Sequence, residues 1–121
     1  MTEIINDEEL NKKFPLSSFY LKGFDGEDTD KLSKMPIMEI KKLLEESEFV
    51  KDEDENGIKY FFEIGEKYNI SDDFISFIGY PYSSEYKKNN DFAFQISILK
   101  NTGEIIRSDA PLTKEELKLF N

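Results

Sequence analysis

The spacing of hydrophobic positions predicts one clear helix in the first half of the chain. From Pro36 onward the apolar residues recur at steps of three and four, at Ile37, Ile40, Leu43 and Leu44. This spacing places their side chains on one face of a helix, with charged residues on the other. Proline suits the first helical turn, where its missing N–H leaves no hydrogen bond unmade. We therefore predict an amphipathic helix at about 36–46.

Short apolar or alternating runs predict about five β-strands. The expected strands are residues 49–50, 58–64, 74–78, 92–99 and 104–107. Asn56-Gly57 between the first two runs is a strong hairpin signal, and further turns are expected at 65–69 and 100–103. Strands that follow one another through short turns pair as an antiparallel meander.

The alternation within two of these strands predicts which side chains face the core. In the second strand one face carries Ile58, Tyr60, Phe62 and Ile64, and the opposite face carries Lys59, Phe61 and Glu63. In the fourth strand the core-facing positions are Phe92, Phe94, Ile96 and Ile98. Successive strand residues point to opposite sides, so each set shares one side of the sheet.

Both ends of the chain carry helix signals. Asp7 is positioned to cap a helix over residues 8–13, which would end before Pro15 because the residue preceding proline avoids the α conformation. Thr113 and Glu116 form a capping-box pattern at the start of a short C-terminal helix. We predict one α+β domain over residues 1–121, in which residues 1–13 could form a partly mobile arm.

The residue types exclude several kinds of chemistry. The chain has no cysteine and no histidine, so it lacks thiolate nucleophiles, disulfides and the commonest metal ligands. The segment 25–30 gathers carboxylates around Gly26, but their spacing does not match a calcium loop, and we interpret it as a solvated turn. We expect no cofactor, no metal and no enzymatic activity.

The charge of the chain indicates which partners it attracts. The formal net charge is −10 and the isoelectric point is about 4.5, so the long-range field repels nucleic acid and attracts basic proteins. The N-terminal residues do not resemble a secretory leader, and no run of 18 apolar residues occurs. We therefore expect a cytoplasmic protein that binds neither nucleic acid nor membrane directly.

Acidic residues are densest between residues 45 and 55, where seven carboxylates meet one lysine and the local charge is −6. Four of these carboxylates are consecutive: Asp52, Glu53, Asp54 and Glu55. Such a segment contributes little to folding and can speed the association of a basic partner. The alternative is a solvated hairpin tip with no binding role.

The second candidate binding feature is a group of tyrosines around a polar loop. Tyr80, Tyr82, Glu85 and Tyr86 lie after the third predicted strand, and Pro81 stiffens the chain between the first two. Tyrosine buries a large area with few rotatable bonds, which suits a protein interface. Alternatively, these rings cover an edge of the sheet.

This profile of one small acidic domain with exposed tyrosines and no catalytic set resembles the small acidic immunity proteins encoded beside bacterial polymorphic or contact-dependent toxins. The resemblance implies a non-enzymatic antitoxin that binds a basic, nuclease-like toxin domain and occludes its active cleft. Asp52, Glu53, Asp54 and Glu55 would then meet lysine or arginine, with Tyr82 and Tyr86 as anchors.

Three other readings of the sequence stay open. The same profile fits a phage-type inhibitor, including one that mimics the charge of nucleic acid. It also fits a housekeeping interaction domain. An enzyme that uses carboxylates is the remaining alternative, and its candidate residues are Glu63, Asp72 and Asp73.

Overall fold

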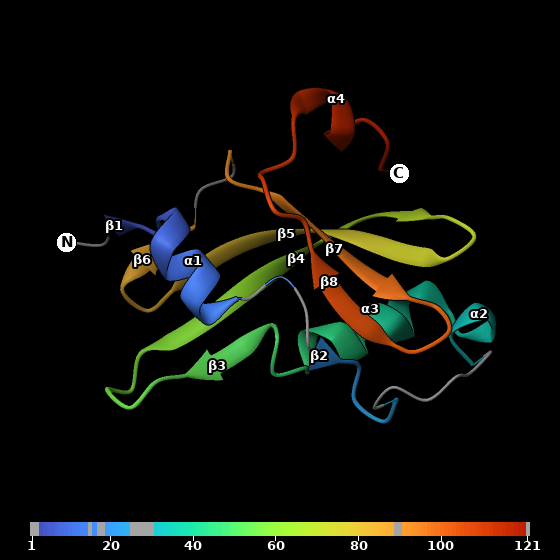
Figure 1. The fold of residues 1–121 in the computed structure, drawn as a ribbon, viewed down its shortest axis with the longest axis horizontal. Coiled ribbons are helices and arrows are strands. Elements are labelled where there is room, and N and C mark those ends of the chain that lie inside the picture. Colours follow the sequence, from blue (N-terminus) through green and yellow to red (C-terminus); the bar gives the residue numbers. More distant parts are fainter. Residues whose placement is uncertain (1–2, 15, 17–18, 25–30, 89–90, 121) are drawn as a thin grey trace.

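The protein is an α+β structure built on a six-stranded antiparallel sheet (Figure 1). The computed structural model describes residues 3–14, 16, 19–24, 31–88 and 91–120. The sheet order is β2-β8-β7-β5-β4-β3. Its strands are β2 (Phe19–Tyr20), β3 (Lys51–Glu53), β4 (Lys59–Ile70), β5 (Phe74–Ser83), β7 (Phe94–Leu99) and β8 (Glu104–Arg107).

The predicted fold class is confirmed, because β3, β4, β5, β7 and β8 form an antiparallel meander. The sixth strand, β2, was not predicted. It pairs with β8 at the far edge of the sheet through Phe19 opposite Ile105 and Tyr20 opposite Glu104. A separate parallel pair joins β1 (Glu3–Ile4) to β6 (Tyr86–Lys87).

The two central strands run longer than the sequence predicted. The expected turn at 65–69 is wrong, because β4 continues to Ile70. Its register shifts between Ile64 and Tyr68, so that three residues of β4 lie opposite one residue of β5. Such a bulge absorbs Gly65 without ending the strand. The true turn is at 71–74, where the Ser71 N–H donates to the Phe74 carbonyl at 2.9 Å.

A second boundary also moves. Residues 49–50 form a turn, and the strand predicted there begins at Lys51 instead. By contrast, β8 occupies the predicted residues 104–107, and Gly103 in the preceding turn has a positive φ of 75°. A left-handed backbone at that position favours glycine.

In the described part of the chain, four short helices accompany the sheet: α1 (Asp7–Lys13), α2 (Lys31–Lys34), α3 (Ile37–Glu45) and α4 (Lys114–Leu117). The amphipathic helix at 36–46 and the capping box of Thr113 and Glu116 are confirmed. The cap of α1 differs from the prediction. Asn6, and not Asp7, accepts the hydrogen bond from the Glu9 N–H at 3.0 Å, so Asp7 is the first helical residue.

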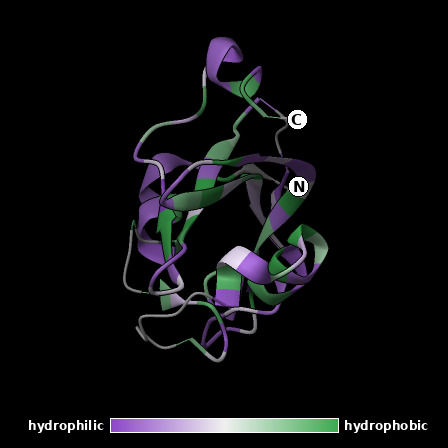
Figure 2. Cartoon of the chain, turned by 90° about the vertical axis from the view of Figure 1, so that its right-hand side faces the viewer, coloured by the Kyte–Doolittle hydropathy of each residue, from purple (hydrophilic) through white to green (hydrophobic). Residues whose placement is uncertain are grey.

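The main core lies on one side of the sheet, which we call the helix face. It joins Tyr60, Phe62 and Ile64 of β4 to Ile40 and Leu44 of α3, all buried. The predicted core positions of β7 hold for Phe94, Ile96 and Ile98, whereas Phe92 is only partly buried against this core. In Figure 2 the strands are coloured mostly hydrophobic, whereas the outer part of α4 is hydrophilic.

The N-terminal residues, which the sequence allowed to be a mobile arm, contribute to this core. Ile5 and Leu10 are each 2% exposed, and Phe14 is fully buried. Arg107 of β8 is 2% exposed and holds this region, because its Nε donates to the Phe14 carbonyl at 2.8 Å and one terminal nitrogen donates to Asn11 Oδ1 at 2.7 Å. Residues 5–14 are thereby fixed to the sheet.

The opposite side, which we call the outer face, is covered only in part. The C-terminal segment places Leu112 and Phe120 against Ile78 and Ala93, with Tyr80 and Leu117 at the margin of this second cluster. On the remaining outer face of β4 and β5, Glu63 is exposed and Phe61, Tyr80 and Tyr82 are partly exposed. Within the described residues, no helix is long and apolar enough to span a membrane.

Candidate functional site

The acidic segment forms the turn and first strand of the β3–β4 hairpin. Asp52 and Glu53 lie in β3 and are exposed, as is Glu55 in the turn. Asp54 has a different role, because its Oδ1 accepts hydrogen bonds from the N–H groups of Asn56 and Ile58 at 2.9 and 3.0 Å. These bonds shape the turn that precedes Gly57. The other three carboxylates are exposed, although Asp52 Oδ1 also accepts the Glu53 N–H at 2.9 Å.

A lysine from α1 further withdraws Asp54 from the surface. Lys13 Nζ lies 3.8 Å from Asp54 Oδ2, and the two side chains are only 16% and 14% exposed. The same ammonium group lies 4.7 Å from the centre of the Tyr60 ring. Burial raises the pKa of Tyr60 to about 12, with Glu9 and Asp54 contributing in the same direction. The fold thus offsets part of the −6 charge that the sequence shows.

Tyr80 and Tyr82 do not lie in a loop, as was predicted, but in β5 on the outer face. Pro81 is tolerated between them for two reasons. Its partner Phe62 directs its own N–H to the Val50 carbonyl, so no ladder hydrogen bond is expected from position 81 toward β4. On the other side of β5, pairing with β7 ends at Gly79. The missing N–H of proline therefore breaks no ladder bond.

The exposed part of the outer face carries a stacked aromatic pair. Phe61 of β4 is the cross-strand partner of Tyr82, and the two rings stack with centroids 5.2 Å apart and an interplanar angle of 24°. Both side chains are partly exposed. Sequence reasoning named Tyr82 and missed Phe61. The signal for Phe61 was present, since it is an aromatic residue on the otherwise charged face of the second predicted strand.

Tyr80, which is partly exposed like Tyr82, has different neighbours. Its ring lies 5.7 Å from Lys88 Nζ, and Lys88 forms an ion pair with Glu63 at 2.8 Å. The hydrogen bond to Glu63 raises the pKa of Lys88. Leu117 and Tyr80 both pack at the margin of the second cluster. Tyr80 therefore contacts the C-terminal segment and lies on the same face of β5 as Tyr82.

The other two predicted residues lie apart from this pair. Tyr86 is in β6 and packs against the core on the helix face. Glu85 is exposed in the turn before it, where Ser83 Oγ accepts the N–H groups of Glu85 and Tyr86 at 3.0 and 2.9 Å. The structure thus brings Tyr80 and Tyr82 together and separates Tyr86 from them.

A hollow of about 620 Å³ adjoins Phe61 and includes two of the predicted carboxylates. Its lining residues are Glu48, Lys51, Asp52, Glu53, Lys59 and Phe61. Lys59 is the cross-strand partner of Glu53, and Lys51 is that of Phe61. The hollow is therefore not purely acidic. It combines charges of both signs around an aromatic side chain, which is typical of the rim of a protein interface.

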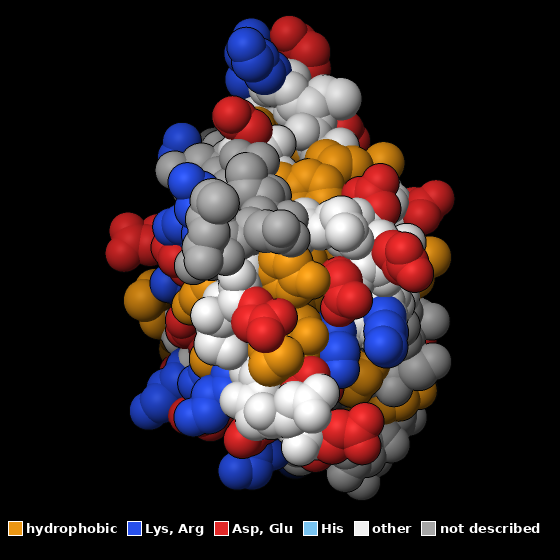
Figure 3. All heavy atoms as spheres, turned by 90° about the vertical axis from the view of Figure 1, so that its left-hand side faces the viewer, with side chains coloured by type: hydrophobic (Ala, Val, Ile, Leu, Met, Phe, Trp, Pro, Cys, Tyr) orange, Lys and Arg blue, Asp and Glu red, His pale blue; other side chains and the backbone are white. Residues whose placement is uncertain are grey.

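Figure 3 shows the end of the molecule that carries α1 and the β3–β4 hairpin. Acidic side chains are spread over this face between hydrophobic ones, and basic side chains gather mainly toward its left and lower margins. Charged and apolar groups thus alternate on this face, and the acidic groups are not gathered in one block.

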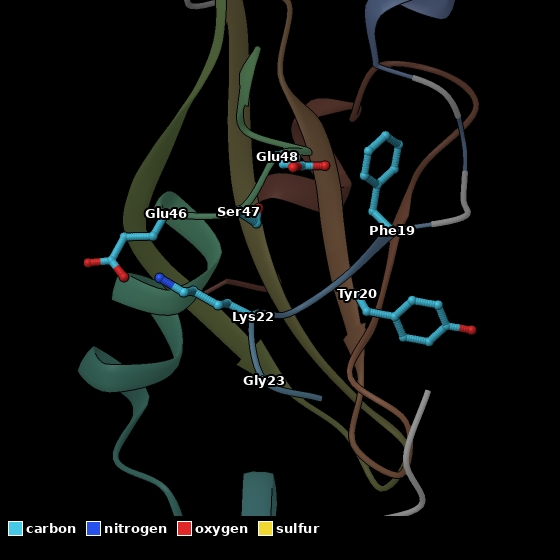
Figure 4. Close-up of a pocket in the computed structure, with 7 residues that line it drawn as sticks. All are labelled: Phe19, Tyr20, Lys22, Gly23, Glu46, Ser47 and Glu48. Carbon is cyan, nitrogen blue, oxygen red and sulfur yellow. The ribbon is translucent and has the colours of Figure 1, made fainter. Parts of the chain in front are cut away.

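A second pocket, of about 580 Å³, lies where the C-terminal end of α3 meets β2 (Figure 4). It is lined by Phe19, Tyr20, Lys22, Gly23, Glu46, Ser47 and Glu48. Sequence reasoning missed it entirely. The two sides of the pocket, residues 19–23 and residues 46–48, meet because β2 pairs with β8. No local sequence pattern predicts a two-residue strand.

The expected turn at 25–30 lies outside the described residues. Among the residues that the structure does describe, no group of three or more acidic side chains could hold a metal ion. Asp72 and Asp73, the candidates for a carboxylate enzyme, occupy the exposed turn between β4 and β5. Glu63 is held in its ion pair with Lys88.

Comparison with protein-family models, with curated proteins and with solved structures finds no match. The case for function therefore depends on the geometry of these surfaces.

Proposed function

We propose that this chain is a non-enzymatic binding protein that neutralises a basic, nuclease-like toxin domain by covering its active cleft. The observation that supports the proposal is the stacked pair of Phe61 and Tyr82 on the accessible part of the outer face. Stacked aromatic side chains bury a large area on binding and have few rotors to immobilise. The binding surface proposed is this pair together with the adjoining hollow.

The charges around the aromatic pair favour a basic partner. Asp52, Glu53 and Glu55 are exposed at the hairpin, and the whole chain carries a net charge of −10. A field of this sign accelerates encounter with a positively charged protein, whereas the aromatic pair lengthens the life of the complex once formed. The two features act on different rate constants, which makes their roles separable.

The first experiment captures the partner and measures its inhibition. The tagged protein is used to isolate partners from a lysate of its source cells at low salt and at about 0.5 M salt, where exposed charges are screened. The captured chain is then purified, and its nuclease activity is measured with and without an equimolar amount of the protein. We expect one basic chain, recovered less well at high salt, whose activity is lost in the complex.

Two variants and a matched control locate the surface. Phe61→Ala is expected to weaken binding by about tenfold or more, mainly through faster dissociation. Glu53→Lys is expected to slow association at low salt and to have less effect at about 0.5 M salt. Glu115→Lys makes the same charge change on exposed α4 and should have the smallest effect. Capture of no basic chain, or inhibition that neither variant alters, would refute the proposal.

A further inference from the structure

The pocket in Figure 4 combines an aromatic ring with carboxylates across a cavity. Figure 4 shows the Glu48 carboxylate directed toward the Phe19 ring, while Lys22 extends toward Glu46 and Tyr20 points away. The Phe19 ring is fixed by its edge-on contact with Phe49, with centroids 5.4 Å apart. A group that entered between Glu48 and Phe19 would therefore meet a negative charge on one side and a rigid ring on the other.

The backbone of the pocket adds to its preference for cations. Glu46 caps the C-terminal end of α3, and Ser47 follows with its hydroxyl donated to the Leu44 carbonyl at 2.6 Å. The end of a helix carries partial negative charge, which favours a cation near its last turn. Within the described part of the chain, no ion pair or hydrogen bond occupies the carboxylate of Glu46 or Glu48. Both carboxylates are available to a ligand.

Among the described residues that line the pocket, Lys22 is the one cation, and it does not neutralise the site. Its side chain points toward Glu46 in Figure 4, but the two groups form no ion pair within 4.0 Å. Together with Glu46 and Glu48, these described lining residues carry one net negative charge in addition to that of the helix end. A second cation therefore has a carboxylate to bind, although Lys22 repels it.

Glu48 connects this pocket to the proposed binding surface. It lines both the pocket of Figure 4 and the hollow beside Phe61. A partner that covers Phe61 and lies over β3 therefore passes Glu48 and reaches the mouth of the pocket. This continuity argues that the cation comes from the partner protein.

Arginine fits the pocket better than lysine does. The planar guanidinium group can stack on an aromatic ring and offer paired N–H donors to a carboxylate at the same time. An ammonium group can lie over a ring and beside a carboxylate, as Lys13 does with Tyr60 and Asp54, but it lacks the planar fork for a two-point bond to the carboxylate. We infer that the pocket receives, between Phe19 and Glu48, an arginine side chain of the partner protein that covers Phe61, with Glu46 adding negative charge at the far side of the pocket. The choice of a partner protein as the source of the arginine rests on the proposed function.

The test uses the full chain and a peptide, and it needs no partner. Amide NMR spectra are recorded during titration with acetyl-Gly-Arg-Gly-amide and with the same peptide carrying citrulline, the neutral isostere, in place of arginine. We expect the arginine peptide to shift the Gly23, Ser47 and Glu48 signals in a saturable way, with a Kd on the order of 1–10 mM. The citrulline peptide should leave them unchanged. Equal shifts with both peptides, or no saturable shift, would overturn the inference.

Variants that change the charge of the pocket test whether it prefers a cation. Glu46→Gln with Glu48→Gln should weaken binding of the arginine peptide about tenfold, whereas Lys22→Met should strengthen it several-fold because a like charge is removed. Glu115→Gln on α4 is the matched control and should change nothing. These positions are exposed, and thermal unfolding of each variant verifies that the fold is retained. Unchanged binding in the double variant, or weaker binding in Lys22→Met, would count against the site.

Free arginine distinguishes the source of the ligand. A site for a protein side chain should bind the blocked peptide at least as tightly as free arginine, since the blocked peptide lacks the charged termini of the amino acid. Tighter binding of free arginine would overturn the partner-protein part of the inference. Failure of the peptide titration leaves the capture experiment unaffected, and failure of capture leaves the arginine pocket standing by itself, so the two proposals fail separately.

Discussion

Two charged side chains of this protein, Asp54 and Arg107, act inside the fold although their residue types suggest the surface. In the sequence Asp54 is one of four consecutive carboxylates. In the fold its Oδ1 accepts hydrogen bonds from two backbone N–H groups and its Oδ2 faces Lys13. In the sequence Arg107 is the last residue of a predicted strand, where a charged side chain is expected to be exposed. In the fold it is 2% exposed and donates hydrogen bonds to carbonyl and amide oxygens. In both cases some of the partners come from the distant N-terminal region, namely Lys13 for Asp54 and Asn11 and Phe14 for Arg107, so composition alone does not reveal the role.

Replacing Arg107 should reveal how much the N-terminal region depends on it. A lysine at this position would place one ammonium group where three guanidinium nitrogens now donate to Phe14, Asn11 and Ser108. Arg107→Lys is expected to lower the free energy of unfolding by about 2–4 kcal/mol, because buried acceptors lose charged donors. Urea denaturation measures the change. A loss below about 0.5 kcal/mol, the range of ordinary surface substitutions, would contradict the assignment.

The raised pKa of Tyr60 predicts that the protein loses stability at high pH. Its pKa is raised from 10.0 to about 12 in the folded protein, chiefly by burial, so the folded state holds the phenolic proton more tightly than the unfolded chain does. The resulting stabilisation is complete below pH 10 and disappears as the pH rises to about 12. Two pH units correspond to about 3 kcal/mol.

The measurement compares unfolding free energies of the native protein and Tyr60→Phe between about pH 9 and pH 12. The difference between the two proteins isolates Tyr60 from the lysines, which titrate over the same range. The native protein should lose more stability than the variant across this interval. Parallel curves for the two proteins would contradict a raised pKa at Tyr60.

At the scale of elements, local signals predicted most of the sheet and failed where pairing overrides them. The capping box at Thr113, the amphipathic helix and the strand at residues 104–107 each depend on neighbouring residues, and all were predictable. By residue type, Gly65 and Pro81 are expected to interrupt strands. They sit within β4 and β5 because a bulge absorbs the glycine, and because position 81 is not expected to bond to β4.

In the candidate site too, some features follow from neighbouring residues and others only from strand pairing. The acidic hairpin and Tyr82 could be found from the sequence, and Phe61 was marked by its place on a charged strand face. The pocket of Figure 4 could not be found, because Phe19 and Glu48 are distant in sequence and meet only when β2 adds to β8. Pairing of a two-residue strand is decided by the completed sheet and not by propensity.

Two glycines with positive φ give a matched pair of predictions for the turns. A Cβ atom at Gly103 would lie 2.6 Å from the Cβ of Phe24, whereas one at Gly23 would meet nothing within 4 Å. Gly103→Ala should cost about 2–4 kcal/mol from backbone strain and overlap together. Gly23→Ala should cost only about 1 kcal/mol, from strain alone. Thermal or urea unfolding compares them, and equal losses would show that Phe24 moves aside freely.

At the scale of the whole molecule, the charge of −10 opposes the folded state. Like charges repel more strongly when the chain is compact, and salt screens this repulsion. We expect the Tm to rise by a few degrees between about 10 mM and 300 mM NaCl. A neutral osmolyte at equal osmolarity serves as the control for effects unrelated to charge. A Tm that falls with added NaCl would show that favourable ion pairs outweigh the repulsion.

The attachment of the N-terminal residues to β8 also constrains the order of folding. The bond from Arg107 to the Phe14 carbonyl joins positions 93 residues apart, and β2 gains its strand partner only from β8. Contacts between distant parts of a chain are slow to form because a long loop must close first. During synthesis, therefore, residues 5–14 and β2 cannot complete their packing until β8 has been made. Residues that are translated before the rest of the sheet are thus among the last to reach their native place.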